Sequence, residues 1–576
     1  MSELTARLSS SPSDRVTQSL AAVAVALTAA SLARLSYGLD RGLELTDESF
    51  YLLSAMHAES IRLFFSPTHW VSGALWQVSQ SLFAFRALGL GLTTASAMLL
   101  AWGVLSVAPR AGLAVSGDRL TEGAVFGASV SGALIYGSLM SFTPSYNLLG
   151  AIGACFAMGL GLLAIADDRH AARATALATL AGLTLGITVL CKFSTGVCTA
   201  GLLLGLQAVM TWKQPRKRID SLLMVACAFA AVGAAMLGTT GVHEAIRQFG
   251  AGVEIVWFAQ RDKTTTVRLA RSAMDIGGML AGVVASFGGP LACLALGAFR
   301  WPVVLGCLGA AWFAFSLAAG DHLTAGVSHH LVQALPLAAA LILVLLINIR
   351  RWARSGSGVF LVLTLAALPL AIALGTANPL QTQILGAMAP WGVLIGLLAF
   401  SGQRSNLPGA MIGVLFCLTV LLHVITNGVE PFRLRAFTEQ TEAVEISDLG
   451  RLKVDSVTAT LVRSMKSAAE QCDIKSRAPF LDFYNLPGVA LMTGARPVET
   501  PWLLDRDYAA VALKRTDPDT LRSSVVAVKR NDRGELPKPP PQLEAFPRGF
   551  RLCGRATGPI DGLPIELWAP LPTSRN

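Results

Sequence analysis

The sequence predicts a polytopic, all-helical membrane domain followed by a C-terminal domain of mixed α/β structure. Three observations support this fold class. The chain of 576 residues is 53% hydrophobic and only 14% charged, with a mean hydropathy of +0.56, which is unusual for a soluble globular protein. Apolar runs of about 18 to 25 residues, each long enough to cross roughly 30 Å of hydrocarbon as a helix, recur along most of the chain. After residue 426 the composition becomes polar and mixed in charge.

About thirteen apolar runs are long enough to be membrane spans. They cover residues 17–37, 81–107, 122–141, 147–166, 174–191, 194–212, 219–240, 272–298, 301–319, 330–348, 357–375, 384–401 and 408–426. The first run resembles a signal peptide, but because a dozen similar runs follow it, we expect an uncleaved membrane helix.

Lysine and arginine occur in every second loop between these runs, which predicts the orientation of the protein in the membrane. The basic loops contain Arg110 and Arg119, Arg169 and Arg173, residues 213–218, Arg300, residues 350–354, and Arg404. Placing these loops inside makes the N-terminus cytoplasmic and the C-terminal domain extracytoplasmic. The net charge of +10 then reflects topology, and we expect no nucleic acid partner. The bias toward Ala, Gly and Arg indicates a GC-rich bacterium, hence an inner membrane and a periplasmic C-terminal domain.

The predicted domains are a transmembrane domain over residues 1–426, with long outer loops at 38–80 and 241–271, and a soluble domain over residues 427–576. The soluble domain has roughly 150 residues, enough for one globular unit. We expect a helix at 461–472 and a strand at 523–530 within it. Its only cysteines, Cys472 and Cys553, are either paired or free thiols. An oxidising compartment favours a disulfide.

Polar side chains gather in the outer loops and at the outer helix ends, whereas the inner loops hold basic residues and little else. Ionisable groups at the ends of membrane helices are costly and tend to mark functional sites. We therefore expect a catalytic or binding cavity that opens outward. The residues that converge on this side are Asp47, Glu48, His57, His69, Tyr146, Asn147, Lys192, His243, Glu244, Arg247, Asp262, Arg271, Asp321, His322, His329 and His330.

The segment "LTDESFYLLSAMHAES" in the first outer loop has two interpretations. Thr46, Asp47 and Glu48 form a helix start, with a hydroxyl cap and acids in the first turn. In the structural interpretation this is an interfacial helix whose apolar residues Phe50, Leu53 and Ile61 rest on the membrane. In the functional one, Asp47 is a base held ionised at the helix N-terminus, ready to accept a proton. The two interpretations do not exclude each other.

Lys192 ends the fifth apolar run at the predicted outer edge, against the bias of positive charge to the inside. Its partner is either a lipid headgroup, with ordinary snorkelling, or a substrate phosphate, which a lysine neutralises well. Arg247 and Arg271 in the second long outer loop are weaker candidates for the same role.

Histidines usually pack or cap, so a direct role for His57, His69, His243 or His322 is the less favoured interpretation. His329 and His330 are adjacent and would point about 100° apart on a helix, which makes a poor metal site. We therefore predict no metal site. Tyr146 and Asn147 begin the fourth run, where Asn147 as a helix cap is a sufficient explanation.

Several motifs, in their order along the chain, resemble the GT-C superfamily. They are "TDESFY", "FRALGLGL" with Arg86, "SYN", "GLTLGITVLCKFSTG" and, in the soluble domain, "PFLDFYNLPGVALMTGARPVETP" at 479–501. This superfamily includes protein O-mannosyltransferases, aminoarabinose transferases acting on lipid A, and oligosaccharyltransferases. The motifs cover about residues 17–270, and the remainder of the chain is similar in architecture.

The resemblance implies an integral-membrane glycosyltransferase that moves a sugar from a polyprenyl-phosphate carrier to an extracytoplasmic lipid, glycan or protein, among membrane lipids and without a cofactor. It implies Asp47 as general base with Glu48 in support, and Lys192 at the carrier phosphate. The acidic motifs of the metal-dependent oligosaccharyltransferase branch are not found, which favours metal-independent chemistry. The alternative is a transporter or lipid-linked saccharide flippase, which would predict an internal repeat and polar residues near mid-membrane. The expected substrate-binding residues are Lys192, Tyr146, Asn147, His57, His69, Arg86, Arg247, Arg271 and His330.

Overall fold

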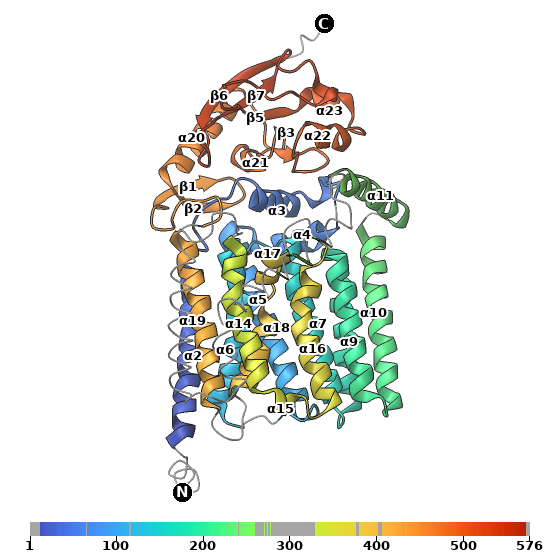
Figure 1. The fold of residues 1–576 in the computed structure, drawn as a ribbon. Helices are drawn as coiled ribbons and strands as arrows, with labels where there is room; N and C mark the ends of the chain where they lie inside the picture. The colour runs from blue at the N-terminus through green and yellow to red at the C-terminus, as the bar shows by residue number, and fades with distance from the viewer. Residues whose placement is uncertain are drawn as a thin grey trace.

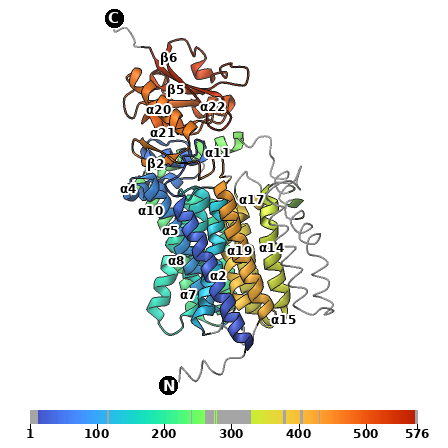
Figure 2. The ribbon, with the colours of Figure 1, turned by 90° about the vertical axis from the view of Figure 1, so that its left-hand side faces the viewer.

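The computed structural model describes residues 12–64, 66–113, 117–239, 241–259, 270, 273, 274, 277, 329–375, 380–400, 406–429 and 431–571. Figures 1 and 2 show a bundle of long helices, a layer of short helices over one end of it, and a mixed α/β region above that layer. We call residues 431–571 the α/β region. The two chain ends lie at opposite ends of the molecule.

Helices occupy eleven of the thirteen predicted apolar runs. Of the other two, 301–319 lies outside the described residues, and 272–298 has only residues 273, 274 and 277 among them. Eight of the described helices are long and apolar enough to cross a membrane. The other three, α6, α14 and α18, are shorter or less apolar over the part described. The eleven helices are α2 (Pro12–Tyr37), α5 (Leu82–Val107), α6 (Arg119–Leu134, continued by η2, Ile135–Ser138), α7 (Tyr146–Ala166), α8 (Ala171–Cys191), α9 (Phe193–Thr211), α10 (Pro215–Thr239), α14 (His329–Ile347), α16 (Gly356–Ala373), α18 (Ala389–Phe400) and α19 (Leu407–Val429).

Small residues let the helices of the bundle approach closely, as is common in membranes. A Cβ at Gly103 of α5 would lie 2.6 Å from the carbonyl oxygen of Gly159 in α7. A Cβ at Gly392 of α18 would lie 2.2 Å from the carbonyl oxygen of Ala128 in α6. Larger residues at these positions would push the helices apart. Helices distant in sequence also pack together, including α2 with α19 and α9 with α16.

Several of the basic connections lie at the end of the bundle that is remote from the α/β region, on the side of the N-terminus. The short helix α15 (Ile349–Trp352), which contains Arg350 and Arg351, is at this end (Figure 1). Arg110, after α5, forms an ion pair of 2.7 Å with Asp168, after α7. This agrees with the alternation of basic loops in the sequence.

The α/β region contains a two-stranded and a five-stranded sheet. In the larger sheet the order is β4-β3-β5-β7-β6, with β3 parallel to β4 and β5, and with β7 antiparallel to β5 and β6. The mixed α/β prediction is confirmed: the expected helix lies in α20 and the expected strand in β5. The elements are β1 (Glu442–Ile446), β2 (Gly450–Val454), α20 (Ser456–Gln471), β3 (Pro479–Phe483), α21 (Pro487–Thr493), β4 (Arg496–Pro497), α22 (Arg506–Ala512), α23 (Pro518–Ser523), β5 (Val525–Lys529), η3 (Pro541–Leu543), β6 (Phe550–Thr557) and β7 (Pro564–Pro570).

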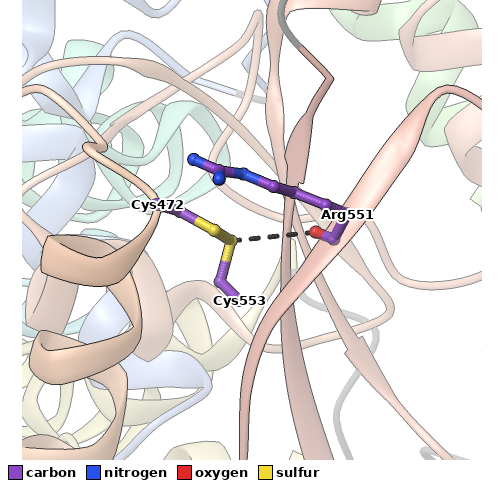
Figure 3. Close-up of a disulfide and its surroundings, with 3 residues drawn as sticks. All are labelled: Cys472, Arg551 and Cys553. Carbon is purple, nitrogen blue, oxygen red and sulfur yellow. Dashed lines mark hydrogen bonds between the residues drawn. A yellow bond between two sulfur atoms is a disulfide. The ribbon is translucent and has the colours of Figure 1, made fainter.

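A disulfide joins Cys472, at the end of α20, to Cys553 in β6, with the Cα atoms 5.6 Å apart (Figure 3). The disulfide favoured by the sequence is confirmed. It ties the helix that packs on the sheet to an edge strand, across a sequence separation of 81 residues.

The first long loop forms the layer between the bundle and the α/β region, with α3 (Asp47–Met56), η1 (Ala58–Ser60) and α4 (Thr68–Ser79) (Figure 1). The expectation that the apolar side chains of α3 rest on the membrane is wrong. Leu53 is buried in a core shared with the α/β region, Ile61 is also buried, and the rings of Phe50 and Trp502 are 5.1 Å apart. The pattern of apolar residues predicts a buried face but does not identify what covers it.

Candidate active site

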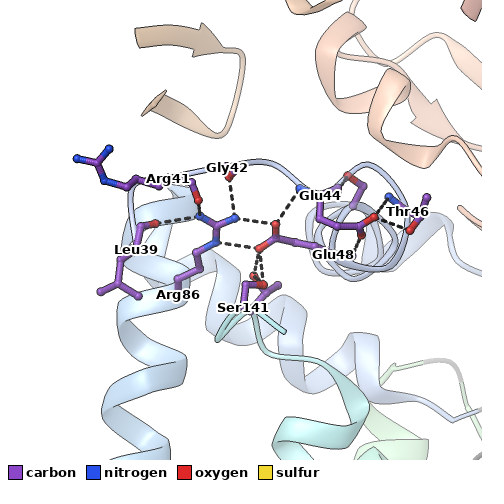
Figure 4. A network of polar contacts seen from close by, with 10 residues as sticks. Leu39, Arg41, Gly42, Glu44, Thr46, Glu48, Arg86 and Ser141 are labelled. Carbon is purple, nitrogen blue, oxygen red and sulfur yellow. Dashed lines mark hydrogen bonds and ion pairs between the residues drawn. The ribbon is translucent and has the colours of Figure 1, made fainter. Parts of the chain in front are cut away.

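A buried ion pair between Glu48 of α3 and Arg86 of α5 holds the first outer loop to the bundle (Figure 4). Both side chains are only 2% exposed. The Arg86 Nε donates to Glu48 Oε1 at 2.8 Å and its Nη2 donates to Oε2 at 2.6 Å. The remaining N–H groups donate to the carbonyl oxygens of Leu39, Arg41 and Gly42 at 2.9 to 3.0 Å. All five donors of the guanidinium are therefore used by the protein, and none is left for the substrate contact expected from the sequence.

Glu48 is also saturated by its neighbours. Its Oε1 accepts hydrogen bonds from the hydroxyls of Ser141 at 2.7 Å and Thr143 at 2.5 Å, in the segment before α7. Burial alone would raise the pKa of Glu48, but Arg86 and the two hydroxyls outweigh burial and lower it. The carboxylate is thus held ionised and fully hydrogen-bonded, which suits a structural role better than proton transfer.

Glu44 caps the start of α3, although the sequence predicted a hydroxyl cap from Thr46. The Glu44 Oε2 accepts the backbone N–H of Glu48 at 2.9 Å, and Oε1 accepts the N–H of Thr46 at 3.0 Å and its hydroxyl at 2.5 Å. Thr46 makes no side-chain cap. The prediction of a helix starting at Asp47 is confirmed, while that of the capping group is wrong, because the Thr46 hydroxyl donates to Glu44 and the Glu44 carboxylate accepts the helix N–H instead.

Asp47 differs from its neighbour Glu48 in having an open carboxylate. It is half-buried, and among the described residues no hydrogen bond to its side chain is found. Burial raises the pKa of Asp47, and the positive charge of Arg433, in the segment after α19, opposes that rise. Arg433 itself donates to the Thr46 hydroxyl and lies 3.9 Å from Glu44. A carboxylate with free lone pairs and a raised pKa is suited to accept a proton.

Lys192 lies at the junction of α8 and α9 and is only 4% exposed. Its Nζ donates to the Asn147 side-chain oxygen at 3.0 Å and to the Ile372 carbonyl oxygen of α16 at 2.7 Å. An ammonium has three N–H groups, so one donor remains. Within the described part of the chain, no carboxylate lies within 4.0 Å of it. Burial lowers the pKa of Lys192 to about 7, and no carboxylate among these residues offsets that effect.

Tyr146 connects Lys192 to helix α3. Its ring centroid is 5.9 Å from the Lys192 Nζ and 6.0 Å from the ring of Tyr51, a residue of α3. The pKa of Tyr51 is raised well above its usual value, first by burial and then by the neighbouring Tyr146 and Asp47. We call Asp47, Tyr51, Tyr146, Asn147 and Lys192 the outer cluster. It joins α3, α7 and the α8/α9 junction at the end of the bundle facing the α/β region.

The expected cap at Asn147 is replaced by a neighbour. Ser145 is the N-cap of α7, and its hydroxyl accepts the backbone N–H of Leu148 at 3.1 Å. This leaves the Asn147 amide free to hold Lys192. The sequence "SYN" contains two possible caps, Ser145 and Asn147. Only the position of Lys192 in the fold shows that Asn147 has another partner and that Ser145 is the cap.

The remaining predicted site residues are not in the outer cluster. His57 is buried at the end of α3, and burial lowers its pKa. His69 of α4 packs against Phe64 and Trp70, and burial lowers its pKa to about 3. Both are therefore neutral near pH 7.

Arg247 is an exposed residue of α11 (Val242–Ala259) and is paired with Glu244 at 2.6 Å. His330 belongs to the first turn of α14, and Arg271 lies outside the described residues. Among the residues described, no group of three or more His, Cys, Asp or Glu side chains could hold a metal ion. Tyr51, Glu44 and Arg433 were not predicted from the sequence. Only Tyr51 could have been, because it is the tyrosine of "TDESFY".

No family model and no curated protein matches the sequence. Solved structures do match. One is the archaeal oligosaccharyltransferase AglB from Archaeoglobus fulgidus, in complex with an inhibitory peptide and a dolichol-phosphate, at 12% identity and a TM-score of 0.44 over 88% of this chain and 69% of that one. Another is ArnT from Cupriavidus metallidurans in the apo state, at 12% identity and a TM-score of 0.40 over 94% and 97% of the two chains. A third is the arabinosyltransferase EmbB from Mycobacterium smegmatis, at 16% identity and a TM-score of 0.30 over 68% of this chain and 41% of that one.

All three matches have sequence identities of 16% or less and TM-scores of 0.44 or less. The similarities are distant, and the function proposed next is argued from this chain's own residues.

Proposed function

We propose that this protein is an integral-membrane glycosyltransferase that transfers a sugar from a polyprenyl-phosphate carrier to an extracytoplasmic acceptor, with Asp47 as the general base. The observation that carries the proposal is that the outer cluster contains both an open carboxylate, Asp47, and a buried lysine, Lys192, that has no carboxylate partner among the described residues. The reaction needs a group that accepts the proton of the acceptor and a group that stabilises the negative charge on the leaving phosphate. A carboxylate suits the first need and a lysine the second.

Asp47 would take the proton from an acceptor hydroxyl or amine as that group attacks the anomeric carbon of the sugar. The bond between this carbon and the phosphate oxygen breaks at the same time, and its electron pair leaves with the polyprenyl phosphate. General base help of this kind contributes about 10²- to 10⁴-fold to the rate. The absence of a hydrogen-bonded partner for the Asp47 carboxylate among the described residues keeps it available for this step.

Lys192 would bind the carrier phosphate through its third N–H group and stabilise the charge that develops on it. A cation removed from water acts more strongly on a developing anion than one in solvent. Its position between α7 and α16, at the end of both helices, is one that a carrier lying in the bilayer can reach. Tyr146 and Asn147 would then be substrate-side neighbours that orient Lys192.

Glu48 and Arg86 receive a positioning role in this proposal, instead of the supporting and substrate-binding roles expected from the sequence. Their hydrogen bonds fix the loop at residues 39–42 and the first turn of α3, which bears Asp47. Fixing a catalytic group in one geometry lowers the entropy cost of reaching the transition state.

The proposal also retains the predicted location: a cell inner membrane, a cytoplasmic N-terminus and a periplasmic α/β domain over residues 427–576. The basic connections remote from the α/β region support this orientation. The disulfide supports an oxidising compartment for the α/β region.

The test is to reconstitute the purified protein, supply a panel of polyprenyl-phosphate sugars with membrane extract as the acceptor source, and follow release of free polyprenyl phosphate. Asp47→Asn should lower turnover by about 10²- to 10⁴-fold while polyprenyl phosphate still binds. Lys192→Ala should weaken that binding. Glu59→Gln, an exposed acid of the same loop, and Lys475→Ala, an exposed lysine of the α/β region, are the matched controls and should be unchanged. Full turnover by Asp47→Asn would refute the role of Asp47 as the general base. If the native chain consumed no donor, the transferase proposal would be refuted and transport would be tested instead.

A further inference from the structure

Helix α11 leaves the bundle by a sharp turn at its α/β end. It begins at Val242, three residues after α10 ends at Thr239, and Gly241 in this turn has φ of +76°, a conformation that glycine adopts readily. Figure 1 shows α11 above the end of α10 and below the α/β region, away from the direction of the long helices. Its axis therefore does not continue the span of α10.

Three exposed large apolar side chains of α11 lie on one face. At 100° per residue, Ile246, Phe249 and Val253 fall within about 60° of one another around the helix. They are 62%, 53% and 45% exposed, which is unusual for three neighbouring large apolar residues on one helix face.

The opposite face of α11 is polar and already has a partner. Gln248 is buried, and Glu254 lies 3.8 Å from Arg515 just after α22. Gln248, Ala251 and Glu254 line a cavity together with residues of the α/β region. Among the described residues, the α/β region therefore covers the polar face, and the three apolar side chains stay largely exposed.

The surface next to this apolar face belongs to the lipid-facing side of the bundle. Helix α10 packs on α8 and α9, and its large apolar residues Leu222, Phe229 and Leu237 are strongly exposed. In a span, such residues face hydrocarbon. Because α11 begins just after this helix ends, its exposed apolar side chains lie near the level at which the exposed apolar surface of α10 ends.

We propose that α11 is an interfacial helix, with Ile246, Phe249 and Val253 inserted between the lipids of the adjacent leaflet and with the α/β region resting on its polar face. A helix with a sharp division into an apolar and a charged face is typical of this position. The sequence assigned this role to α3, whose apolar face the α/β region buries. Helix α11 thus supports the α/β region at a fixed height above the bilayer, and this role does not depend on the chemistry proposed for the outer cluster.

Photo-cross-linking tests the proposal without requiring activity. The photoreactive residue p-benzoylphenylalanine is introduced singly at Phe249, Ile246 or Ala251, and the full chain is reconstituted in vesicles of phosphatidylethanolamine and phosphatidylglycerol. After irradiation, intact-protein mass spectrometry and peptide mapping identify the adducts. Position 237, in the exposed part of α10, is the positive control for lipid contact, and position 533, exposed in the α/β region, is the negative one.

Phe249 and Ile246 are expected to give lipid adducts at a yield within a few-fold of position 237, and Ala251 to cross-link within the chain, to residues near α22. Use of two apolar positions protects the test from a substitution that impairs folding. The proposal is overturned if the two apolar positions give no more lipid adduct than position 533. It is equally overturned if they cross-link to a second copy of the chain or to the α/β region.

Discussion

Removing Arg86 tests the most heavily hydrogen-bonded element of the candidate site. In Arg86→Met, the buried Glu48 carboxylate loses its counter-charge and three backbone carbonyls lose their donors. Breaking a buried ion pair by deleting one partner costs about 3–5 kcal/mol. Arg86→Lys keeps the charge, but three N–H groups replace five, so at least two hydrogen bonds are lost at about 1 kcal/mol each. The expected loss of stability is therefore larger for Met than for Lys.

The double variant Arg86→Met with Glu48→Leu provides the decisive comparison. It removes the unpaired charge, so it should be more stable than Arg86→Met alone, by about 1–3 kcal/mol of coupling between contacting residues. Denaturant unfolding of the detergent-purified chains measures this, with Arg451→Met, an exposed arginine of the α/β region, as the matched control. The stabilising role of the Glu48–Arg86 ion pair would be refuted if Arg86→Met had the same free energy of unfolding as Arg451→Met. It would also be refuted if the double variant were less stable than Arg86→Met alone.

Two further predictions concern the α/β region. Cys472→Ser with Cys553→Ser should lower the free energy of unfolding of this region by about 4–5 kcal/mol, the chain-entropy value for a closed loop of this length, measured by chemical unfolding. An unfolding midpoint that is insensitive to this change would contradict it. Burial raises the pKa of Asp482 to about 7, although the backbone N–H groups of Leu486 and Leu503 donate to it. Because the folded state then holds a proton that the unfolded state has lost, stability contributed by this group is present below about pH 4 and is lost as the pH rises through about 7. Asp482→Asn should remove this loss and gain melting temperature, relative to the native chain, between pH 4 and pH 8, whereas parallel pH profiles would exclude it.

The spans of the bundle could be predicted because each depends on a local property, the length of an apolar run. The contacts that each span makes with other helices could not be predicted in this way. Lys192 was identified as an anomaly by its side of the membrane, yet one of its acceptors, Ile372, is 180 residues away in α16. Sequence alternation places the ends of α8 and α16 on the same side but does not show that they are neighbours.

The same limit applies to the first outer loop. Asp47 and Glu48 are adjacent acids at a helix start, and the sequence treats them alike. The structure separates them, because Arg86, 38 residues later, pairs with Glu48 only. Adjacent residues of a helix point about 100° apart, so the two carboxylates face different surroundings, and one is saturated while the other is open.

The burial of α3 has a consequence for the order of events during synthesis. Phe50 packs on Trp502, and the chain between them is about 450 residues long, so at roughly 5–20 residues per second the ribosome needs on the order of 20 to 90 s to produce the partner. During that interval the apolar face of α3 has none of its final contacts from the C-terminal region. The contacts between α3 and the α/β region can therefore form only after residue 502 has been synthesised, and until then the nascent chain leaves an apolar surface for chaperones and proteases to recognise.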